Sequence, residues 1–282
     1  KKKKKFKQEN LKNLAPSDIC DWWITRDLVL LDVPSSYMVP PSSLWNTLLK
    51  SVKDILHKSS LQGVVIALNL PELIKEQTIQ AKTPLVMHLK RRIIELRNQF
   101  GKDLPCHLVI TKCDLTAGFA DFFSECSSEE LSQAWGVTIP TINENEKWPE
   151  VFSSRFNLLI KRLNKQLIWR LHQERDSTAK SSIKDFPLHI ERLKENINQF
   201  FKSLNIPDLC IRSVYLTCGK LDESKKQLPY LQSISHSLVT ISQPAQPRSY
   251  FIHQLIHHGL AVTEPRKTSP IKNIKWMKPL TY

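Results

Sequence analysis

Polar side chains that could bind a ligand come directly after several apolar stretches of the chain. Four such stretches are followed by Asp32, by Asn69, by Thr111-Lys112-Cys113-Asp114 and by Thr217-Cys218-Gly219. Each stretch predicts a buried strand of a parallel sheet. Ligands of open α/β sheets bind beyond the carboxyl ends of the strands, where these carboxylate, ammonium and hydroxyl groups would lie. The sequence therefore predicts a ligand site at this edge of a sheet.

The segment Thr111-Lys112-Cys113-Asp114 is the most specific of these groups, and it resembles the guanine-reading element of P-loop GTPases. In that element the Asp carboxylate accepts hydrogen bonds from the ring N–H and the exocyclic amine of guanine, and the stem of the Lys packs over the base. The resemblance implies these roles for Asp114 and Lys112. A strand-end turn capped by Asp114 is the alternative interpretation.

The segment Asp32-Val33-Pro34-Ser35 lies where such GTPases place an Asp-X-X-Gly element. In that element the Asp orients magnesium through water, and the Gly amide contacts the terminal phosphate. Here Ser35 replaces the glycine, and Pro34 removes one backbone donor. We therefore interpret Asp32 as the remnant of a metal site beside a damaged phosphate site.

Glycine is too sparse for a phosphate-binding loop. The chain has six glycines, and no two lie closer together than Gly101 and Gly118, which excludes GxGxxG and GxxxxGK[ST]. Without such a loop the chain lacks the positively charged phosphate-binding groups that dominate phosphoryl transfer. We expect no catalytic residue, no metal and no cofactor, with GTP or ATP plus magnesium as the alternative. The expected remnant of a nucleotide pocket consists of Asp32, Ser35, Thr111, Lys112, Asp114, Thr217 and Cys218.

Two histidines invite comparison with zinc proteases. His253 and His257 have the i, i+4 spacing of an HExxH helix. The position of the general base is occupied by Gln254, whose amide cannot take up a proton. The six cysteines contain no CxxC pair and no zinc spacing. We therefore expect a surface or packing role for the histidines and apolar packing roles for most cysteines.

The elements that would position these residues alternate between strand and helix, which is typical of a parallel α/β sheet. A short strand over 21–25 is expected to form a hairpin with the next strand, whose apolar residues predict a central place in the sheet. The three strands that follow 21–25 are expected over 28–33, 63–68 and 106–111, and the intervening helices over 44–56 and 85–100.

Two more helices are expected before the chain returns to a strand over 210–217. One runs from Phe152 to Leu171; a polar break from Asp176 to Lys184 separates it from the second, which contains Ile190 and Phe201. We predict a P-loop GTPase-like α/β fold whose mostly parallel sheet is flanked by helices and carries an inserted helical subdomain. The expected divisions are a basic lead-in (1–17), the α/β core (18–140), the helical insertion (141–205), a returning strand and helix (206–262) and a basic juxtamembrane-type tail (263–282).

The charge balance favours anionic partners. The 282 residues carry a formal net charge of +14, which suits phosphates, acidic proteins or lipid headgroups. The longest apolar run, Leu61 to Leu70, is half of the roughly 20 residues that a membrane span needs. The basic segments 155–170 and Lys90-Arg91-Arg92 lack an RNA-binding signature, so we expect no nucleic acid. Solvated helix faces are the simplest interpretation, a position beside a membrane is the preferred functional one, and a nucleic-acid or lipid-surface module is a third class.

Five groups of residues, in order along the chain, resemble the motifs of one family. They are Cys20-Asp21-Trp22-Trp23 with Val29-Leu30-Leu31-Asp32 and Tyr37; 63–68 with Glu72-Leu73; 111–115 with Ala117-Gly118-Phe119 and Phe122-Phe123; Trp135-Gly136 with Thr138 and Pro140; and 214–219. Together they are similar to the cytoplasmic GTPase-like domain of IcmF/TssM proteins, which are inner-membrane components of type IVB and type VI secretion systems. The resemblance covers about residues 18–262.

This resemblance implies a P-loop NTPase-like domain on the cytoplasmic face of the bacterial inner membrane, between membrane spans. It implies a DotU/TssL-type inner-membrane protein as partner, beside other secretion components. The family's phosphate loop, upstream of the CDWW motif, is absent, and its Asp-Thr-Ala-Gly is Asp-Val-Pro-Ser here. We therefore expect a non-enzymatic scaffold of the type IVB (Dot/Icm-like) branch. The alternative is an active GTP- or ATP-binding switch of a type VI system whose phosphate loop lies outside this chain.

Overall fold

A computed structural model describes most of the chain. The residues described are 20–24, 28–39, 43–56, 61–74, 83–140, 147–219, 249–256 and 260. The predicted basic lead-in, the basic tail and His257 lie outside them. All six cysteines lie within them and are free. In the part of the chain that is described, no helix has both the length and the apolar character needed to cross a membrane.

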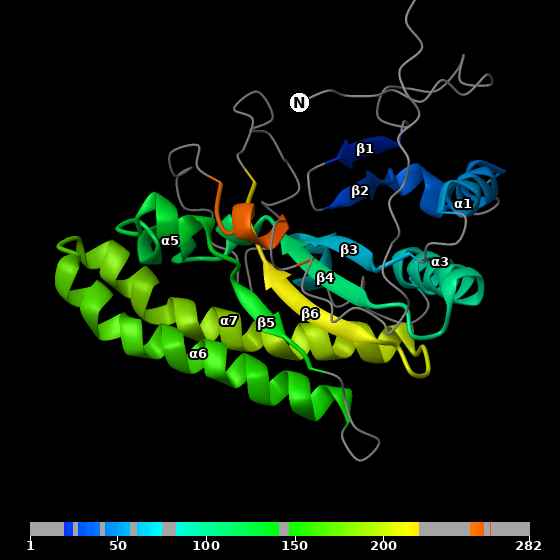
Figure 1. The fold of residues 1–282 in the computed structure, drawn as a ribbon. Helices are drawn as coiled ribbons and strands as arrows, with labels where there is room; N and C mark the ends of the chain where they lie inside the picture. The colour runs from blue at the N-terminus through cyan, green and yellow to red at the C-terminus, as the bar shows by residue number, and fades with distance from the viewer. Residues whose placement is uncertain are drawn as a thin grey trace, which may run out of the picture.

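A four-stranded sheet lies at the centre of the fold, in the order β3-β4-β6-β5 (Figure 1). Three strands run parallel: β3 (Val64–Asn69), β4 (Cys106–Thr111) and β6 (Ile211–Leu216). These strands confirm the predicted positions to within a residue at either end. The edge strand β5 (Gly136–Thr138) runs antiparallel to β6. It was not predicted, because three residues are too few to show a strand period.

The predicted hairpin forms a separate two-stranded sheet. β1 (Asp21–Ile24) pairs antiparallel with β2 (Val29–Asp32). The prediction that the second strand is central in the main sheet is wrong: within the described residues, β2 pairs with β1 alone, and Val29 is 58% exposed. An apolar run indicates that a strand favours burial, but it does not specify which segment will pair with its second edge. The 3-10 helix η2 (Ser35–Met38) follows and packs on the helices α1 (Ser43–Leu56) and α3 (Pro84–Phe100).

The helix α1 (Ser43–Leu56) connects the hairpin to β3, and α2 (Leu70–Ile74) and α3 (Pro84–Phe100) connect β3 to β4. Pro84 occupies the first turn of α3, where its fixed φ suits the helix and its missing N–H is not needed. The helix ends at Gly101, whose φ of 116° is accessible to glycine. The Gly101 N–H donates a hydrogen bond to the Arg97 carbonyl over 2.9 Å, which closes the last turn.

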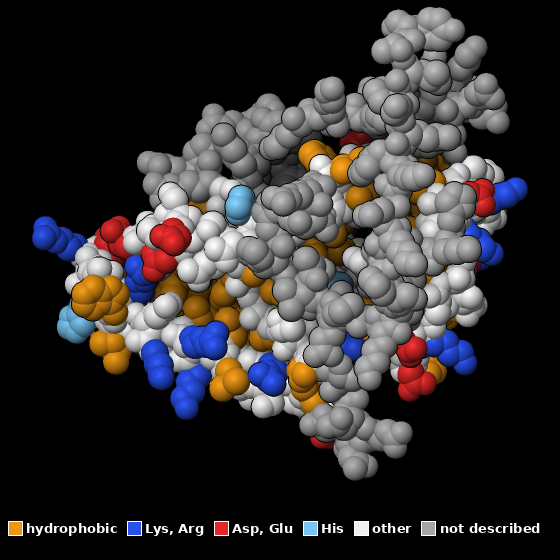
Figure 2. All heavy atoms as spheres, in the orientation of Figure 1, with side chains coloured by type: hydrophobic (Ala, Val, Ile, Leu, Met, Phe, Trp, Pro, Cys, Tyr) orange, Lys and Arg blue, Asp and Glu red, His pale blue; other side chains and the backbone are white. Residues whose placement is uncertain are grey.

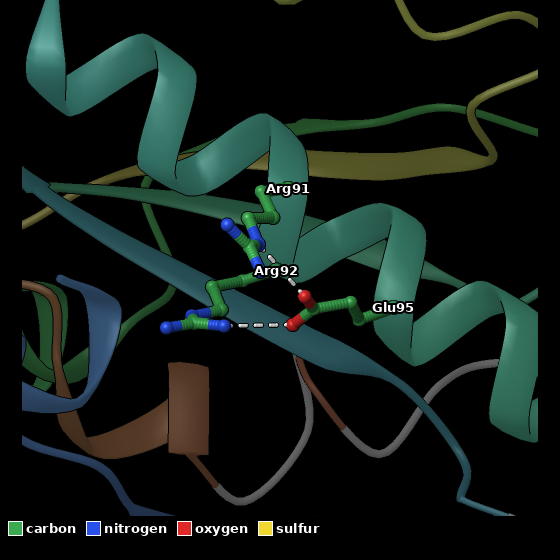
Figure 3. Close-up of polar contacts among 3 residues, drawn as sticks. All are labelled: Arg91, Arg92 and Glu95. Carbon is green, nitrogen blue, oxygen red and sulfur yellow. Dashed lines mark hydrogen bonds and ion pairs between the residues drawn. The ribbon is translucent and has the colours of Figure 1, made fainter. Parts of the chain in front are cut away.

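The buried guanidinium of Arg92 pairs with a carboxylate of its own helix, α3 (Figure 3), and it also contacts a tryptophan ring of α1. The Arg92 Nη1 lies 2.8 Å from the Glu95 Oε2, and the guanidinium carbon lies 4.9 Å from the centre of the Trp45 ring. The exposed Arg91 donates to the other Glu95 oxygen over 3.0 Å. Burial alone would raise the pKa of Glu95, but the hydrogen bonds from Arg92 and Arg91 hold it below its ordinary value. The ion pair lies within α3, whereas the cation–π contact with Trp45 ties α3 to α1.

Two long helices, α6 (Trp148–Gln173) and α7 (Ser177–Leu204), pack on each other and cover one face of the sheet (Figure 1). The predicted polar break from Asp176 to Lys184 is wrong, because α7 already begins at Ser177. The Asp176 carboxylate accepts a hydrogen bond from the Ala179 N–H over 2.8 Å and caps the helix. The first turns of α7 are mostly exposed, so few apolar residues mark them in the sequence.

The core is built around aromatic rings. Between β4 and β5 the chain forms α4 (Phe119–Phe122) and α5 (Ser128–Ser132). The centre of the Phe119 ring lies 5.0 to 6.4 Å from the centres of five other rings: Phe123, Trp135, Phe186, Tyr250 and Phe251. Fully buried side chains of α6 and α7 belong to the same cluster as those of the sheet. The segment predicted as a helical insertion is therefore one layer of a shared core.

Candidate functional site

The loops after β4 and β6 lie side by side at the carboxyl edge of the sheet. The Thr217 N–H donates a hydrogen bond to the Ile110 carbonyl over 2.8 Å, and the Cys113 N–H donates to the Thr217 carbonyl over 3.1 Å. These backbone bonds continue the pairing of the two strands beyond their ends. They hold the segment 111–114 beside Cys218, so five of the seven predicted pocket residues come together.

Asn69 lies at the end of the neighbouring strand, where it pairs in register with Thr111. Its side-chain Oδ1 accepts a hydrogen bond from the Glu72 N–H over 3.0 Å. This bond satisfies one of the free N–H groups at the start of α2. Asn69 therefore has a structural task at this edge of the sheet.

Thr217 and Cys218 are almost fully buried, with 2% and 3% of their surfaces exposed. The Thr217 hydroxyl lies 3.4 Å from the Ile110 carbonyl, to which it donates a hydrogen bond. Burial raises the pKa of the Cys218 thiol far above its usual range, and the charge of Asp114 and a side-chain hydrogen bond with it raise it further. The thiol stays protonated at neutral pH, so it is a poor nucleophile and a poor metal ligand.

Lys112 adopts a left-handed backbone conformation, with φ of 59° and ψ of 36°. This conformation costs a residue with a Cβ on the order of 1 kcal/mol, and it recurs at functional turns. It starts the 3-10 helix η3 (Cys113–Leu115), in which the Cys113 side chain is buried while Lys112 and Asp114 stay partly exposed. The turn thus leaves two charged side chains accessible at the edge of the sheet. A left-handed lysine has no signal in the sequence.

Asp32 and Ser35 belong to the hairpin side of the molecule, apart from the four-stranded sheet. Asp32 ends β2 opposite Asp21, Ser35 begins η2, and the side chains of Asp32 and Ser35 are exposed. Burial raises the pKa of the Cys20 thiol, and the charges of Asp32 and Asp21 raise it further. In the described part of the chain, no hydrogen bond or ion pair connects Asp32 or Ser35 with the segment 111–114. The predicted site is therefore divided between two sheets.

The predicted surface role of the first histidine agrees with the structure, since His253 is exposed. Its partner at the spacing of a zinc helix, His257, lies outside the described residues. No group of three or more His, Cys, Asp or Glu side chains within the described ranges could hold a metal ion.

The residues after the Thr-Lys-Cys-Asp segment pack the core. Gly118 has φ of 78°, and a Cβ added there would collide with the Ser182 carbonyl oxygen of α7. Glycine is therefore needed where α4 approaches the backbone of α7. Phe119, Phe122 and Phe123 follow it and are buried. Their i, i+3, i+4 spacing places the three rings on one apolar face.

Comparison with known proteins places the chain in a family. Residues 41–276 match the family model of the IcmF-related N-terminal domain. The chain is 30% identical over 271 residues to the type VI secretion system component TssM1 of Pseudomonas aeruginosa strain PAO1, an alignment that covers 88% of this chain and 24% of that protein. The chain thus spans about a quarter of the length of this relative. No solved structure matches the chain. The family match, together with the motifs at the sheet edge and in the core, shows that the chain belongs to the IcmF/TssM family of secretion-system components and corresponds to its N-terminal domain.

Proposed function

We propose that this chain is a non-enzymatic scaffold domain of a bacterial secretion system, with a P-loop GTPase-like fold and a degenerate nucleotide pocket. The observation that carries the proposal is that polar groups at the sheet edge are hydrogen-bonded within the protein or buried, so they are not available to a ligand. The Thr217 hydroxyl and the Cys113 amide bond to backbone carbonyls, and Cys218 is buried. Lys112 and Asp114 stay partly exposed, but Asp114 is already hydrogen-bonded to Cys218.

The segment after the hairpin, which would contact the phosphates of a nucleotide, supports the same proposal. Pro34 has no N–H to offer a phosphate, and the Ser35 side chain is exposed at the start of η2. Phosphoryl transfer depends on positioned cations and backbone donors around the transferred group. A domain that keeps its strands and core while losing those donors retains a surface for assembly but not the means for hydrolysis.

We further propose the cytoplasmic face of the inner membrane as the location and a DotU/TssL-type membrane protein, among other secretion components, as the partner. Membership in the IcmF/TssM family supports secretion components as partners. The sequence led us to expect the type IVB branch. The similarity to a type VI component supports the type VI branch instead.

Calorimetric titration of GTP and then ATP, each with magnesium, tests the degenerate pocket. We expect no saturable binding up to millimolar nucleotide, because no phosphate-binding loop compensates for the hydration that the phosphates would lose. Saturable micromolar binding that is lost in Asp114→Ala but retained in the exposed control Asp103→Ala would contradict the proposal. Titration with the purified DotU-type partner then tests the scaffold role, for which saturable binding is expected.

An active nucleotide switch is the second candidate function. The partial exposure of Lys112 and Asp114 favours it, and so does the left-handed backbone of Lys112, because strained backbone conformations recur at functional sites. On this alternative a phosphate loop outside this chain would complete the pocket. If a longer form of the protein bound nucleotide and this chain did not, the result would support the function as a nucleotide switch.

A further inference from the structure

Helix α6 has a second face opposite its buried one. Its buried face consists of Phe152, Phe156, Leu159, Ile160 and Leu163. Residues three and four apart lie on the same side of a helix. The exposed residues at this spacing form what we call the outer stripe: Leu158, Lys161, Arg162, Lys165, Ile168, Trp169 and His172.

The outer stripe mixes cations with large apolar side chains. Ile168 is 66% exposed, Trp169 64% and Leu158 49%. No Asp or Glu occurs in residues 151–173, so no carboxylate on the helix within this range balances the cations. Figure 2 shows Lys and Arg side chains, in blue, alternating with apolar ones along the lower edge of the molecule, over α6. Exposed apolar area and charge of one sign on the same face are typical of an interaction surface.

A helix face that simply meets water has a different composition. Solvent-exposed helices commonly pair acidic with basic residues three or four positions apart. The outer stripe has no such pair, whereas α3 has one between Arg91 and Glu95. A tryptophan at the surface, next to an isoleucine, also exposes more apolar area than solvation alone favours.

We propose that the outer stripe lies flat on the anionic headgroups of a phospholipid bilayer. Trp169 and Ile168 would enter the interfacial layer, which suits an indole ring with one polar atom. The ammonium and guanidinium groups of Lys161, Arg162 and Lys165 would contact lipid phosphates. This inference rests on the proposed membrane location and names the surface that makes the contact.

The shape of the stripe favours a lipid plane over a protein partner. Residues 158–172 rise about 21 Å along one helix axis, at 1.5 Å per residue. The stripe is the convex outside of a helix, so its side chains can reach a flat layer of headgroups together. An acidic protein surface would have to follow this convex line with its own carboxylates.

Vesicle binding by the whole chain tests the inference. The probes are vesicles of phosphatidylglycerol and phosphatidylethanolamine, and neutral phosphatidylcholine vesicles, at physiological salt. One variant removes the stripe cations (Lys161→Gln, Arg162→Gln, Lys165→Gln), and another removes its apolar groups (Ile168→Ser, Trp169→Ser). Matched controls change exposed residues on and beside α1 and α3 (Lys50→Gln, Lys53→Gln, Lys102→Gln; and Met87→Ser, Ile94→Ser). Because every variant keeps the basic ends of the chain, the comparison isolates the stripe.

We expect affinity for anionic vesicles to fall about 100-fold when the three stripe cations are removed, and about 10-fold or more when the apolar pair is removed. The controls should each change it less than 3-fold, and all variants should keep the circular dichroism melting curve of the parent. Equal losses in stripe and control variants would overturn the inference in favour of unspecific charge attraction. Unchanged vesicle binding with lost binding of the DotU-type partner would overturn it in favour of a protein-binding face. Vesicle binding that depends on the stripe, with no partner binding by the parent, would support the inference and contradict the proposed scaffold role alone.

Discussion

The backbone amide of Cys113 donates a hydrogen bond to the carbonyl of Thr217 over 3.1 Å, and this bond joins two motifs that lie far apart in the sequence. The Thr217 amide in turn donates to the Ile110 carbonyl. The position of Lys112 and Asp114 therefore depends on the parallel pairing of β4 with β6. A ligand site at this edge can exist only while that pairing is intact.

The left-handed turn predicts that Lys112→Gly stabilises the fold. Glycine adopts φ of 59° without the clash of a Cβ, so the free energy of unfolding should rise by about 1 kcal/mol. Urea denaturation measures it. Lys50→Gly, in the middle of α1, is the control and should lower the free energy of unfolding by about 1 kcal/mol. A loss of stability in Lys112→Gly would mean that the lysine side chain contributes more than its backbone costs.

The close approach of α4 to α7 predicts that Gly118→Ala is strongly destabilising. The new methyl group would meet the Ser182 carbonyl, and alanine disfavours φ of 78°. We expect a loss of about 2 to 4 kcal/mol by urea denaturation. A Cβ at Gly219 meets no heavy atom within 4 Å, so Gly219→Ala should cost less than about 0.5 kcal/mol. Similar losses for both variants would contradict the close packing of α4 against α7 at Gly118.

Two adjacent arginines share the carboxylate of Glu95, but their substitution should lower the free energy of unfolding by very different amounts. Arg92→Gln removes a buried guanidinium from Glu95 and from the Trp45 ring and should cost about 2 to 4 kcal/mol. Arg91→Gln removes a cation whose side chain is 58% exposed and should cost less than about 0.5 kcal/mol. Thermal and urea unfolding of the two variants compare them directly. Equal effects would show that burial does not govern this ion pair.

The buried His107 predicts a loss of stability in mild acid. Its Nδ1 lies 2.7 Å from the Ser213 Oγ, and burial, helped by the charge of Arg212, lowers the pKa of His107 to about 4. In the unfolded chain the ring takes up a proton near pH 6.5, so its contribution is complete above that value and falls as the pH drops towards 4. Between pH 7.5 and pH 5 the parent should lose about 2 kcal/mol more than His107→Gln, whose amide can still bond to Ser213.

Urea titrations at the two pH values measure this difference. The same substitution at the exposed His172 is the matched control, and it should leave the pH dependence of stability as it is in the parent. If His107→Gln and the parent lost the same amount, the ring would not be the group that couples folding to protons.

Much of the fold could be predicted from local patterns. The segments Val64–Asn69, Cys106–Thr111 and Ile211–Leu216 are strands, and most of their side chains are apolar, as expected for parallel strands that are largely covered by other elements. Pro84 and Gly101 lie at the two ends of α3, where the backbone preferences of proline suit a helix start and those of glycine suit a helix end. Because polar groups follow each of these strands, the sequence was sufficient to predict that the segment 111–114 lies beside Thr217.

Tertiary structure decided what those polar groups are used for. That Asp32 and Ser35 lie on a separate hairpin depends on which strand edges pair, and pairing between distant segments leaves no period in the sequence. The left-handed backbone of Lys112 has no signal in the sequence, and glycine is required at position 118 because the backbone of α7 approaches there. The sequence of α6 already showed a basic amphipathic pattern. The outer stripe is exposed because the opposite face of the helix packs into the core. Local periodicity thus determined the elements, and burial by distant partners determined which polar groups are free to act.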